Sequence, residues 1–354
     1  MRQVSILIPA HNEETVIGPT IESLVKIAPV ADIYVVSDGS TDKTVEKALE
    51  YTSNVLDLRP NRGKAGAMNA AIKHFNLSNR YNYILPMDAD TRIDLYFLVH
   101  ALPILEADLM HRVACVVGKV VGTHTNWITN FRLWEYEVAQ TIHKKAQAIE
   151  NAIIVNPGCS TLYRSEIFNK INFPEGTLTE DMEFTFMIHR QNLGRIVFNE
   201  RAKVLTQDPQ TLQDMVKQLN RWYTGFWQCL VRHNVPWGGQ MLDLELAVLA
   251  TESLFNSLLV LTLFFLVPLA LLANPFLLLF PLGIDLALFL IPSMLLTAIR
   301  HKNWEIFRLV PAFYFLRIVS SLILMRSFVS VVLGIDFKMK WNKVRRYAVA
   351  PLAN

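Results

Sequence analysis

An apolar strand that runs directly into two carboxylates indicates the fold: Tyr83-Ile84-Leu85-Pro86-Met87-Asp88-Ala89-Asp90. Acids two positions apart at a strand end can reach one divalent cation, either directly or through water. Oxygen ligands suit Mg²⁺ or Mn²⁺, and these ions in turn hold phosphate oxygens. Asp88 and Asp90 are therefore candidate metal ligands, although pairs with this spacing are also common on surface turns.

Short β-branched runs alternate with helical patterns before this strand. We expect strands at 4–8, 33–36, 54–58 and 83–87, with helices near 13–27, 42–51 and 65–75 between them. Nearly continuous apolar strands separated by helices predict a parallel α/β sheet. Ligands bind such sheets at the carboxyl ends of the strands, which points to residues 9–13, 37–40 and 88–90. The sequence has neither Gly-x-Gly-x-x-Gly nor a Walker loop, so a dinucleotide or P-loop enzyme is not indicated.

The composition favours a membrane-attached protein. Of the 354 residues 52% are hydrophobic and only 18% are charged, whereas about a quarter are charged in a typical soluble domain. Three scattered cysteines do not form a zinc or disulfide framework, and we expect them to be reduced thiols. A net charge of +3, without a basic stripe in the first two thirds, argues against nucleic acid as a partner. The chain begins in a strand rather than a signal peptide, so we expect the membrane attachment to come later.

The hydrophobic residues are concentrated late in the chain. No charged residue occurs from Ser253 to Ile284, and a second uncharged run follows Asp285. A membrane helix needs about 20 apolar residues, so this region can hold two spans with a break near 273–275. A third stretch, 306–335, contains Arg317 and Arg326, and we expect it to lie at the interface or to pack on protein. The alternative is a set of helices buried in a soluble core, but such helices rarely lack a polar face over this length.

The predicted domain division is a cytosolic catalytic unit at 1–235, transmembrane or interfacial helices at 243–335, and a basic tail at 336–354. Because basic flanks stay cytoplasmic, we expect this tail to be cytosolic in a multi-pass cell-membrane protein. A cytosolic catalytic unit and a cytosolic tail require an even number of crossings. Three hydrophobic stretches satisfy this only if one does not cross, so the number of crossings stays open.

Two amphipathic helices are predicted near 127–150 and 211–230. The first has an apolar stripe and a polar face, and is either a surface helix on the sheet or a helix lying in the membrane interface. Its stripe comprises Trp127, Phe131, Trp134, Val138 and Ile149, and its polar face Arg132, Glu135, Lys144 and Lys145. On the second, Gln218, Arg221 and Trp222 share one face by their spacing. Such a face could hold a diphosphate and stack on a ring, or anchor the helix among lipid headgroups.

Thr179-Glu180-Asp181 begins a helix that continues to Arg190. A threonine N-cap followed by acids that the helix dipole favours would explain this pattern structurally. The functional alternative is that one carboxylate lies near the metal site and deprotonates an acceptor hydroxyl.

Taken together and in this order, the motifs resemble the processive-type family 2 glycosyltransferases, which are the cellulose, chitin, hyaluronan and poly-N-acetylglucosamine synthases. The resemblance covers roughly residues 4–230. The motifs are Ile8-Pro9-Ala10-His11-Asn12-Glu13-Glu14, Val36-Ser37-Asp38-Gly39-Ser40-Thr41-Asp42, Gly63-Lys64-Ala65-Gly66-Ala67-Met68-Asn69, Asp88-Ala89-Asp90, Thr179-Glu180-Asp181 and Gln218-Leu219-Asn220-Arg221-Trp222. It implies a GT-A-like nucleotide-sugar-binding domain followed by a C-terminal helical membrane region.

The resemblance also implies roles for individual residues. Donor binding would fall to Pro9, Glu13, Asp38, Lys64, Asp88, Gln218, Arg221 and Trp222, with Asp38 at the base or ribose. Asp90, assisted by Asp88, would ligate Mg²⁺ or Mn²⁺, and Asp181 would be the general base. Gly158, Cys159, Ser160, Glu180 and Trp222 would border the acceptor. The donor would be a UDP- or GDP-sugar, and the acceptor a glycan or a lipid-linked molecule at the membrane.

Two departures from the synthases keep alternatives open. Polymer-secreting synthases usually carry helices before the catalytic domain and a larger bundle after it, whereas we expect this chain to start with the catalytic domain and to have few later spans. In addition, no gating loop like that of cellulose synthases is evident. A non-processive transferase acting on polyprenyl phosphate or a glycolipid, similar to dolichyl-phosphate mannose synthases, is therefore the main alternative. A catalytically silent membrane scaffold is a further one, but every expected acidic position is filled. One base without a nucleophile predicts a single displacement with inversion, which gives a β-linked product from an α-linked donor.

Overall fold

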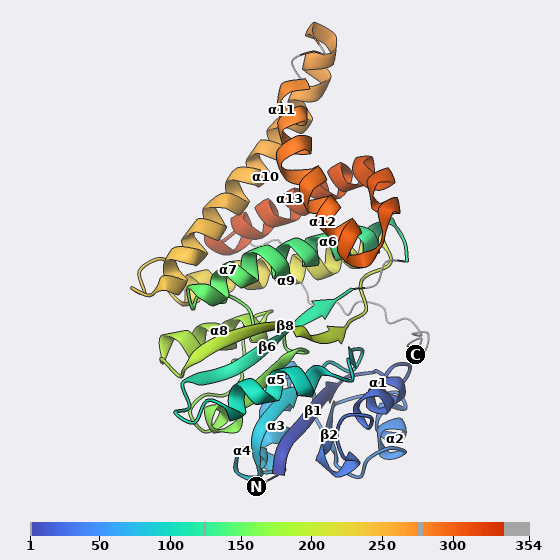
Figure 1. Ribbon diagram of the computed structural model, residues 1–354, viewed down its shortest axis with the longest axis vertical. Coiled ribbons are helices and arrows are strands. Elements are labelled where there is room, and N and C mark those ends of the chain that lie inside the picture. The colour runs from blue at the N-terminus through green and yellow to red at the C-terminus, as the bar shows by residue number, and fades with distance from the viewer. Residues whose placement is uncertain (1, 123–124, 275, 277–278, 336–354) are drawn as a thin grey trace.

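The computed structural model describes residues 2–122, 125–274, 276 and 279–335. The basic tail predicted at 336–354 lies outside these residues. Within them, one mixed sheet forms the base of the molecule, with strand order β3-β2-β1-β4-β7-β6-β8-β5 (Figure 1).

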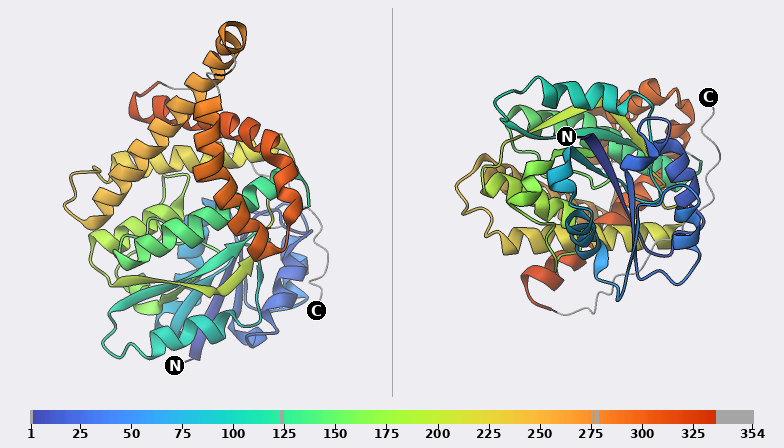
Figure 2. Two further views of the ribbon diagram at one scale, coloured as in Figure 1. Left: turned by 45° about the horizontal axis from the view of Figure 1, so that its top comes forward. Right: turned by 90° about the horizontal axis from the view of Figure 1, so that it is seen from below.

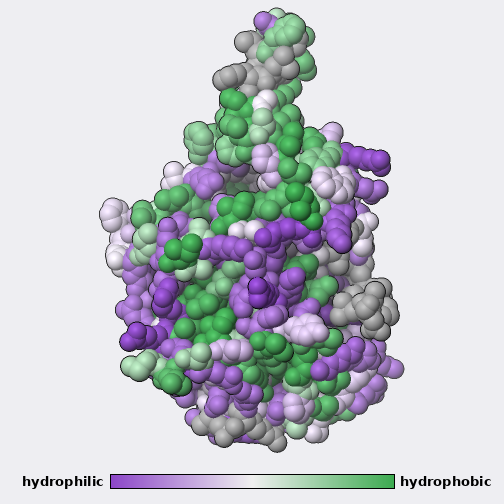
Figure 3. All heavy atoms as spheres, viewed as in Figure 1, coloured by the Kyte–Doolittle hydropathy of each residue, from purple (hydrophilic) through white to green (hydrophobic). Residues whose placement is uncertain are grey.

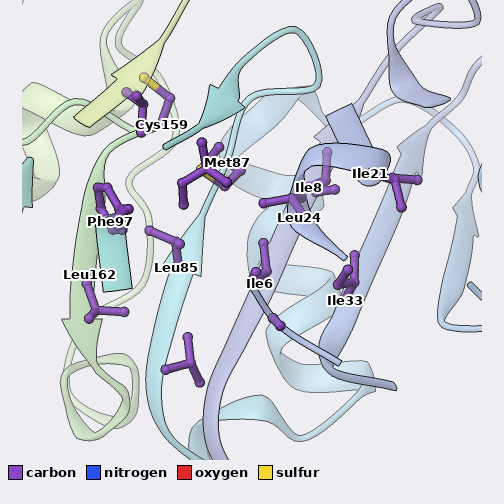
Figure 4. Close-up of a cluster of buried hydrophobic side chains, with 14 of the residues drawn as sticks. Ile6, Ile8, Ile21, Leu24, Ile33, Leu85, Met87, Phe97, Cys159 and Leu162 are labelled. Atoms are coloured by element: carbon purple, nitrogen blue, oxygen red, sulfur yellow. The ribbon is translucent and has the colours of Figure 1, made fainter. Parts of the chain in front are cut away.

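The first half of the sheet is parallel, as predicted. β1 (Arg2–Ala10) pairs in parallel with β2 (Ile33–Asp38) and with β4 (Tyr81–Pro86), and β3 (Val55–Leu58) pairs with β2. The apolar residues of β1 alternate between two cores, because successive side chains of a strand point to opposite faces. Ile6 and Ile8 belong to one buried cluster with Ile21 and Leu24 of α1 (Ile17–Leu24) and with Phe97 of α5 (Phe97–Glu106), and Figure 4 labels these side chains. Leu7 instead packs towards α3 (Gly63–His74), α4 (Leu77–Arg80) and α8 (Glu180–Arg190).

The second half of the sheet, for which no strands are predicted above, is mixed. β7 (Thr161–Arg164) runs antiparallel to both β4 and β6 (Val113–Val121). β8 (Arg195–Leu205) is parallel to β6, and the short β5 (Arg92–Ile93) is antiparallel to β8. The prediction stopped at residue 87, and apolar runs alone do not fix the direction of a strand. On the outer edge, α2 (Thr44–Leu49) connects β2 to β3.

A layer of long helices lies between the sheet and the C-terminal helices (Figure 1). α6 (Trp127–Val138) continues through the π-helical turn η2 (Ala139–His143) into α7 (Lys144–Ile149), and α9 (Leu212–Arg232) lies in the same layer. Phe131 and Trp134, from the predicted apolar stripe, pack against Phe313 with ring centroids 5.2 and 5.4 Å apart. Arg132 and Lys144, from the predicted polar face, are also buried. Residues of both faces are therefore buried within the molecule, whereas Ile149 at the end of the stripe is 82% exposed.

Among the described residues, three C-terminal helices are long and apolar enough to cross a membrane: Met241–Ala273, Pro281–His301 and Trp304–Val332. The first is α10 (Met241–Ala273), which ends at the predicted break. The second joins α11 (Leu279–Ile284), the π-helical η5 (Asp285–Leu290) and α12 (Ile291–His301), and the third joins η6 (Trp304–Leu309) to α13 (Val310–Val332). α10 and α11 project from the body, and hydrophobic side chains gather on their surface (Figures 1, 2 and 3).

α13 differs from the projecting helices because it packs along the body. Phe313 and Leu316 are buried in one cluster with Met215 and Leu219 of α9. The Arg317 guanidinium is compensated, since its Nη1 lies 2.7 Å from Asp285 Oδ2 of η5. The third hydrophobic stretch therefore packs on protein, one of the two arrangements expected from its arginines.

Candidate active site

Asp38 is fixed at the carboxyl end of β2 by the segment that follows β3. Its Oδ1 accepts a hydrogen bond of 2.7 Å from the Arg62 backbone N–H, and its carbonyl oxygen accepts one of 2.8 Å from Asn61 Nδ2. Gly39 makes the turn with φ +66°, and a Cβ there would lie 3.1 Å from the Asn61 backbone nitrogen, so the position favours glycine.

Pro9 and Glu13 lie at the end of the neighbouring strand. Pro9 pairs in register with Val36 of β2, two residues before Asp38. Glu13 is buried, and its backbone N–H donates to Thr44 Oγ1 at 2.8 Å. The predicted base or ribose pocket is thus drawn from the ends of two adjacent strands.

Lys64 joins three predicted site segments. It lies in the first turn of α3, and its Nζ is 2.7 Å from Asp88 Oδ1 and 2.9 Å from Glu180 Oε1. Burial alone would lower the pKa of this ammonium, but the carboxylates of Asp88, Glu180 and Asp181 raise the pKa well above its usual value. Lys64 is therefore a permanent cation at the carboxyl end of the sheet, where an anionic ligand would bind.

The two acids that end the central strand lie beside this cation. Thr20 Oγ1 donates to the Ala89 carbonyl at 2.7 Å and so ties the turn between Asp88 and Asp90 to α1. Asp90 is buried, and burial, together with the charges of both acids, raises the pKa of the Cys159 thiol. The thiol is therefore protonated at neutral pH.

The carboxylate oxygens of Asp88 and Asp90 suit a hard divalent cation that takes only some of its ligands from the protein. Both supply carboxylate oxygens, the type of ligand that Mg²⁺ and Mn²⁺ prefer. Over the described ranges, no group of three or more His, Cys, Asp or Glu side chains could hold a metal ion. Such an ion would therefore need further oxygens from a ligand such as a diphosphate.

Asp181 lies at the start of α8, facing the loop that leads into β7. Its Oδ1 accepts from the Met182 N–H at 2.9 Å, and its Oδ2 lies 3.4 Å from the Gly158 nitrogen. Burial and the Glu180 carboxylate raise the pKa of Asp181, while Lys64 and Arg221 oppose that shift. A carboxyl group with a raised pKa is a stronger base when ionised, which suits it to accept a proton.

Gln218, Arg221 and Trp222 share α9, as predicted from their spacing. Arg221 lies within electrostatic reach of Asp181, since its charge lowers the pKa of that carboxyl group. Gln218 Oε1 is buried and accepts no hydrogen bond from the part of the chain that the structure describes. Trp222 makes a cation–π contact with α6, because the Arg132 guanidinium lies 4.7 Å from the centroid of the Trp222 ring.

Among the predicted acceptor residues, Gly158 is the loop residue best placed to meet a ligand. Cys159 and Ser160 are buried, and Ser160 Oγ donates to the Gly118 carbonyl at 3.2 Å. A Cβ on Gly158 would lie 3.0 Å from Lys64 Nζ and 3.9 Å from the Asp181 Cβ, so this backbone borders the charged cluster directly. Glu180, predicted on the acceptor side, pairs with Lys64.

The sequence reasoning missed several residues of this region. Asn61 and Arg62 follow β3, and the strand-end rule applied to that strand would have found them. Arg132 and Lys144 were placed on a polar helix face, and no local signal distinguishes them from solvent-exposed residues.

Comparison with known proteins finds a family model that matches part of the chain and a solved structure that shares its fold. Residues 5–171 match the model of the family described as Glycosyl transferase family 2. The chain is 26% identical over 236 residues to a poly-beta-1,6-N-acetyl-D-glucosamine synthase of Staphylococcus epidermidis, covering 65% of this chain and 56% of that protein. A synthase of the same name from Staphylococcus aureus (strain COL) is 25% identical over 236 residues, with the same coverage. The chain thus spans a little over half the length of these curated relatives.

One solved structure resembles almost the whole chain. It is a mannosyltransferase from Pyrobaculum calidifontis in complex with GDP-Man and Mn²⁺, with a TM-score of 0.62 and 16% sequence identity. The match covers 95% of this chain and 89% of that one. At this identity, the similarity establishes a common fold.

Proposed function

We propose that this chain is a glycosyltransferase that moves a sugar from a nucleotide-diphosphate sugar to a saccharide or lipid-linked acceptor at a membrane surface. The match of residues 5–171 to Glycosyl transferase family 2 and the similarity to poly-beta-1,6-N-acetyl-D-glucosamine synthases support the proposal. The observation that carries the proposal is the convergence of charged groups from separate segments at the carboxyl end of the sheet. Lys64, Asp88 and Glu180 are joined by ion pairs, and Asp181 lies within electrostatic reach of Lys64 and Arg221.

In the proposed donor complex, Pro9, Glu13 and Asp38 would surround the base and ribose of a UDP- or GDP-sugar. Lys64 and Arg221 would neutralise the diphosphate, whose negative charge grows as it departs from the sugar. Gln218 would donate a side-chain amide N–H to the diphosphate, and Trp222 would offer an aromatic surface to the acceptor.

Asp88 and Asp90 would hold Mg²⁺ or Mn²⁺ against the diphosphate oxygens. Such an ion supplies further stabilisation of charge on the leaving group. The presence of Mn²⁺ in the mannosyltransferase of the same fold is consistent with this assignment.

Asp181 would act as the general base. It would accept the proton of the acceptor hydroxyl while that oxygen attacks the anomeric carbon from the face opposite the diphosphate. A single displacement of this kind inverts the anomeric centre, so an α-linked donor gives a β-linked product.

The three candidate spans would hold the catalytic domain against the membrane. We place this domain on the cytoplasmic face because of the basic tail, which includes Lys338, Lys340, Lys343, Arg345 and Arg346. If α10 and the α11–α12 segment cross while α13 lies along the body, the number of crossings is even, as a cytosolic tail requires.

A donor screen tests the proposal. The full chain is incubated with UDP-GlcNAc, UDP-Glc or GDP-Man and with Mn²⁺ or Mg²⁺, using a membrane extract as the source of acceptor. We expect transfer from one of these donors, with inversion detected by NMR of the product. Absence of transfer from every UDP- and GDP-sugar tested, together with no measurable binding, would contradict the proposal.

A second candidate is non-processive transfer to polyprenyl phosphate or a glycolipid. The small membrane region favours it, since the described residues hold only three candidate spans. Product size separates the two candidates: long chains support a synthase, and a lipid carrying a single sugar supports this alternative.

A further inference from the structure

Lys144 is a buried lysine at the start of α7 that the proposed chemistry does not use. It is 5% exposed, and its Nζ donates one hydrogen bond, of 3.1 Å, to the Val155 carbonyl. Among the described residues, no carboxylate oxygen lies within 4.0 Å of this nitrogen. The adjacent Lys145, by contrast, is partly exposed and pairs with Glu200 at 2.9 Å. Burying an ammonium without a paired carboxylate is costly, so its position needs an explanation.

Lys144 holds the carbonyl of Val155, which is the first residue of a segment that borders Asp181, the proposed base. In this segment, residues 155–158, the Asn156 N–H donates to Thr185 Oγ1 at 2.9 Å, and the Gly158 N–H points to Asp181 Oδ2 at 3.4 Å. Thr185 Oγ1 in turn donates to the Asp181 carbonyl at 2.7 Å. Segment 155–158 is therefore tied to the first two turns of α8, at Asp181 and Thr185, and to α7 through Lys144.

We propose that Lys144 is a positioning residue for Asp181. Its ammonium holds segment 155–158 against α8 and supplies a positive charge within electrostatic reach of the Asp181 carboxylate. This inference rests on the proposed function, in which Asp181 is the base.

Charged and titratable groups reach Asp181 from every element packed around it. They are Glu180 of α8, Lys64 of α3, Arg221 and Cys229 of α9, Tyr163 of β7 and Lys144 of α7. Burial raises the pKa of the Cys229 thiol and of the Tyr163 phenol, so both are neutral at neutral pH. Glu180 therefore raises the pKa of Asp181 while Lys64 and Arg221 lower it, and the Asp181 carboxylate raises the pKa of Lys144, so these two charges also interact.

Lys144 differs from the other two cations in what happens when the donor binds. Lys64 and Arg221 would face the diphosphate, whose negative charge offsets their effect on Asp181. Lys144 is buried and held by Val155, so its charge stays available to the base in the donor complex. Burial lowers the pKa of Lys144 to about 8, which leaves the side chain mostly protonated at neutral pH.

Four variants of the full chain test the inference. Lys144→Met removes both the charge and the hydrogen bond, Lys144→Gln removes the charge but keeps a donor for Val155, and Lys144→Arg keeps the charge. Lys145→Gln is the matched control on the neighbouring residue. For each variant, kcat and the donor KM are measured against pH with the nucleotide sugar that supports transfer in the donor screen.

We expect the acid limb of the kcat profile to move up by about half a pH unit or more in Lys144→Gln and Lys144→Met. A half-unit shift lowers the ionised fraction of Asp181 about threefold on that limb, while the donor KM stays unchanged. Lys144→Arg and Lys145→Gln should keep the wild-type profile.

Superimposable profiles of Lys144→Gln and the wild type would overturn the inference, as would an equal shift in Lys144→Arg. Because Lys144→Gln can keep the Val155 hydrogen bond, it gives a result even if Lys144→Met does not fold. An Asp181→Asn variant that transfers sugar at the wild-type rate would overturn the proposed function as well. An inactive Asp181→Asn beside unchanged Lys144 profiles would overturn this inference alone.

Discussion

Lys64 Nζ lies 2.7 Å from Asp88 Oδ1, and this ion pair joins the first turn of α3 to the end of the central strand β4. The same nitrogen is 2.9 Å from Glu180 Oε1 at the start of α8. A single cation thus connects the three segments that carry the proposed diphosphate, metal and acceptor residues. Since a diphosphate carries more charge than either carboxylate, we expect it to draw Lys64 to itself on binding.

Lys64→Met should therefore reduce kcat/KM by about 100-fold, the typical effect of removing one preorganised group that stabilises developing charge. Lys73→Met is the control, since Lys73 lies on the same helix and is exposed. Steady-state transfer and donor binding are measured for both variants. Equal kinetics for Lys64→Met and Lys73→Met would show that Lys64 does not contact the donor.

The proposed metal site predicts that EDTA abolishes transfer and that added Mn²⁺ or Mg²⁺ restores it. Asp90→Asn should require a higher Mn²⁺ concentration for half-maximal rate, because a neutral amide is a weaker ligand for a hard cation. The rate is titrated against Mn²⁺ for the wild type and the variant. Full transfer after exhaustive chelation, or identical Mn²⁺ titrations, would be incompatible with ligation by Asp90.

Glu137 connects the catalytic sheet to the C-terminal helices. It is 1% exposed, and its carboxylate oxygens lie 2.8 Å from Lys119 Nζ of β6, 2.9 Å from His301 Nε2 and 3.2 Å from Arg300 Nη1 of α12. Breaking a buried pair costs about 3–5 kcal/mol, so Glu137→Gln should clearly lower the thermal midpoint. Glu150→Gln, on the exposed end of α7, is the control. Unfolding in detergent is followed by circular dichroism, and equal midpoints for the two variants would refute a stabilising role.

The contribution of Glu137 to the stability of the folded protein should also depend on pH. Burial alone would raise the pKa of its carboxyl group, but hydrogen bonds from His301, Lys119 and Thr141 hold that pKa below its usual range. A carboxyl whose pKa is lower in the folded state stabilises the protein above its unfolded pKa of about 4.3. That contribution is lost as the pH falls towards the folded pKa. The difference in midpoint between the wild type and Glu137→Gln should therefore shrink below about pH 4, and a constant difference would contradict the assignment.

The projecting part of α10 should bind lipid. Phe265 and Leu269 are 70% and 62% exposed there, and a lysine at the centre of a membrane helix costs about 2.5–3.5 kcal/mol. Phe265→Lys combined with Leu269→Lys should reduce co-flotation with phospholipid vesicles. Leu109→Lys is the control, because Leu109 is 85% exposed in the loop after α5. Equal flotation of the double variant and the control would argue against insertion of this helix.

Much of the site could be predicted because its residues lie at strand ends, where chain order and side-chain chemistry are both visible in the sequence. Asp38 and Asp88 end apolar strands, and the parallel half of the sheet brings these ends to one edge. The contacts of Arg132 and Lys144 could not be predicted, since they depend on helices that are distant in the sequence. Amphipathic periodicity identifies two faces of a helix but does not say what covers each face. For the same reason, the packing of α13 on α9 is visible only in the structure.

The account depends most on Asp181 as the base beside a bound diphosphate. The direct measurement is a comparison of Asp181→Asn with the wild type, using single-turnover transfer and donor affinity on the same preparations. We predict that the rate falls by about 10²–10⁴-fold, the usual contribution of a general base, while donor affinity is retained. Transfer at the wild-type rate by Asp181→Asn would contradict the account.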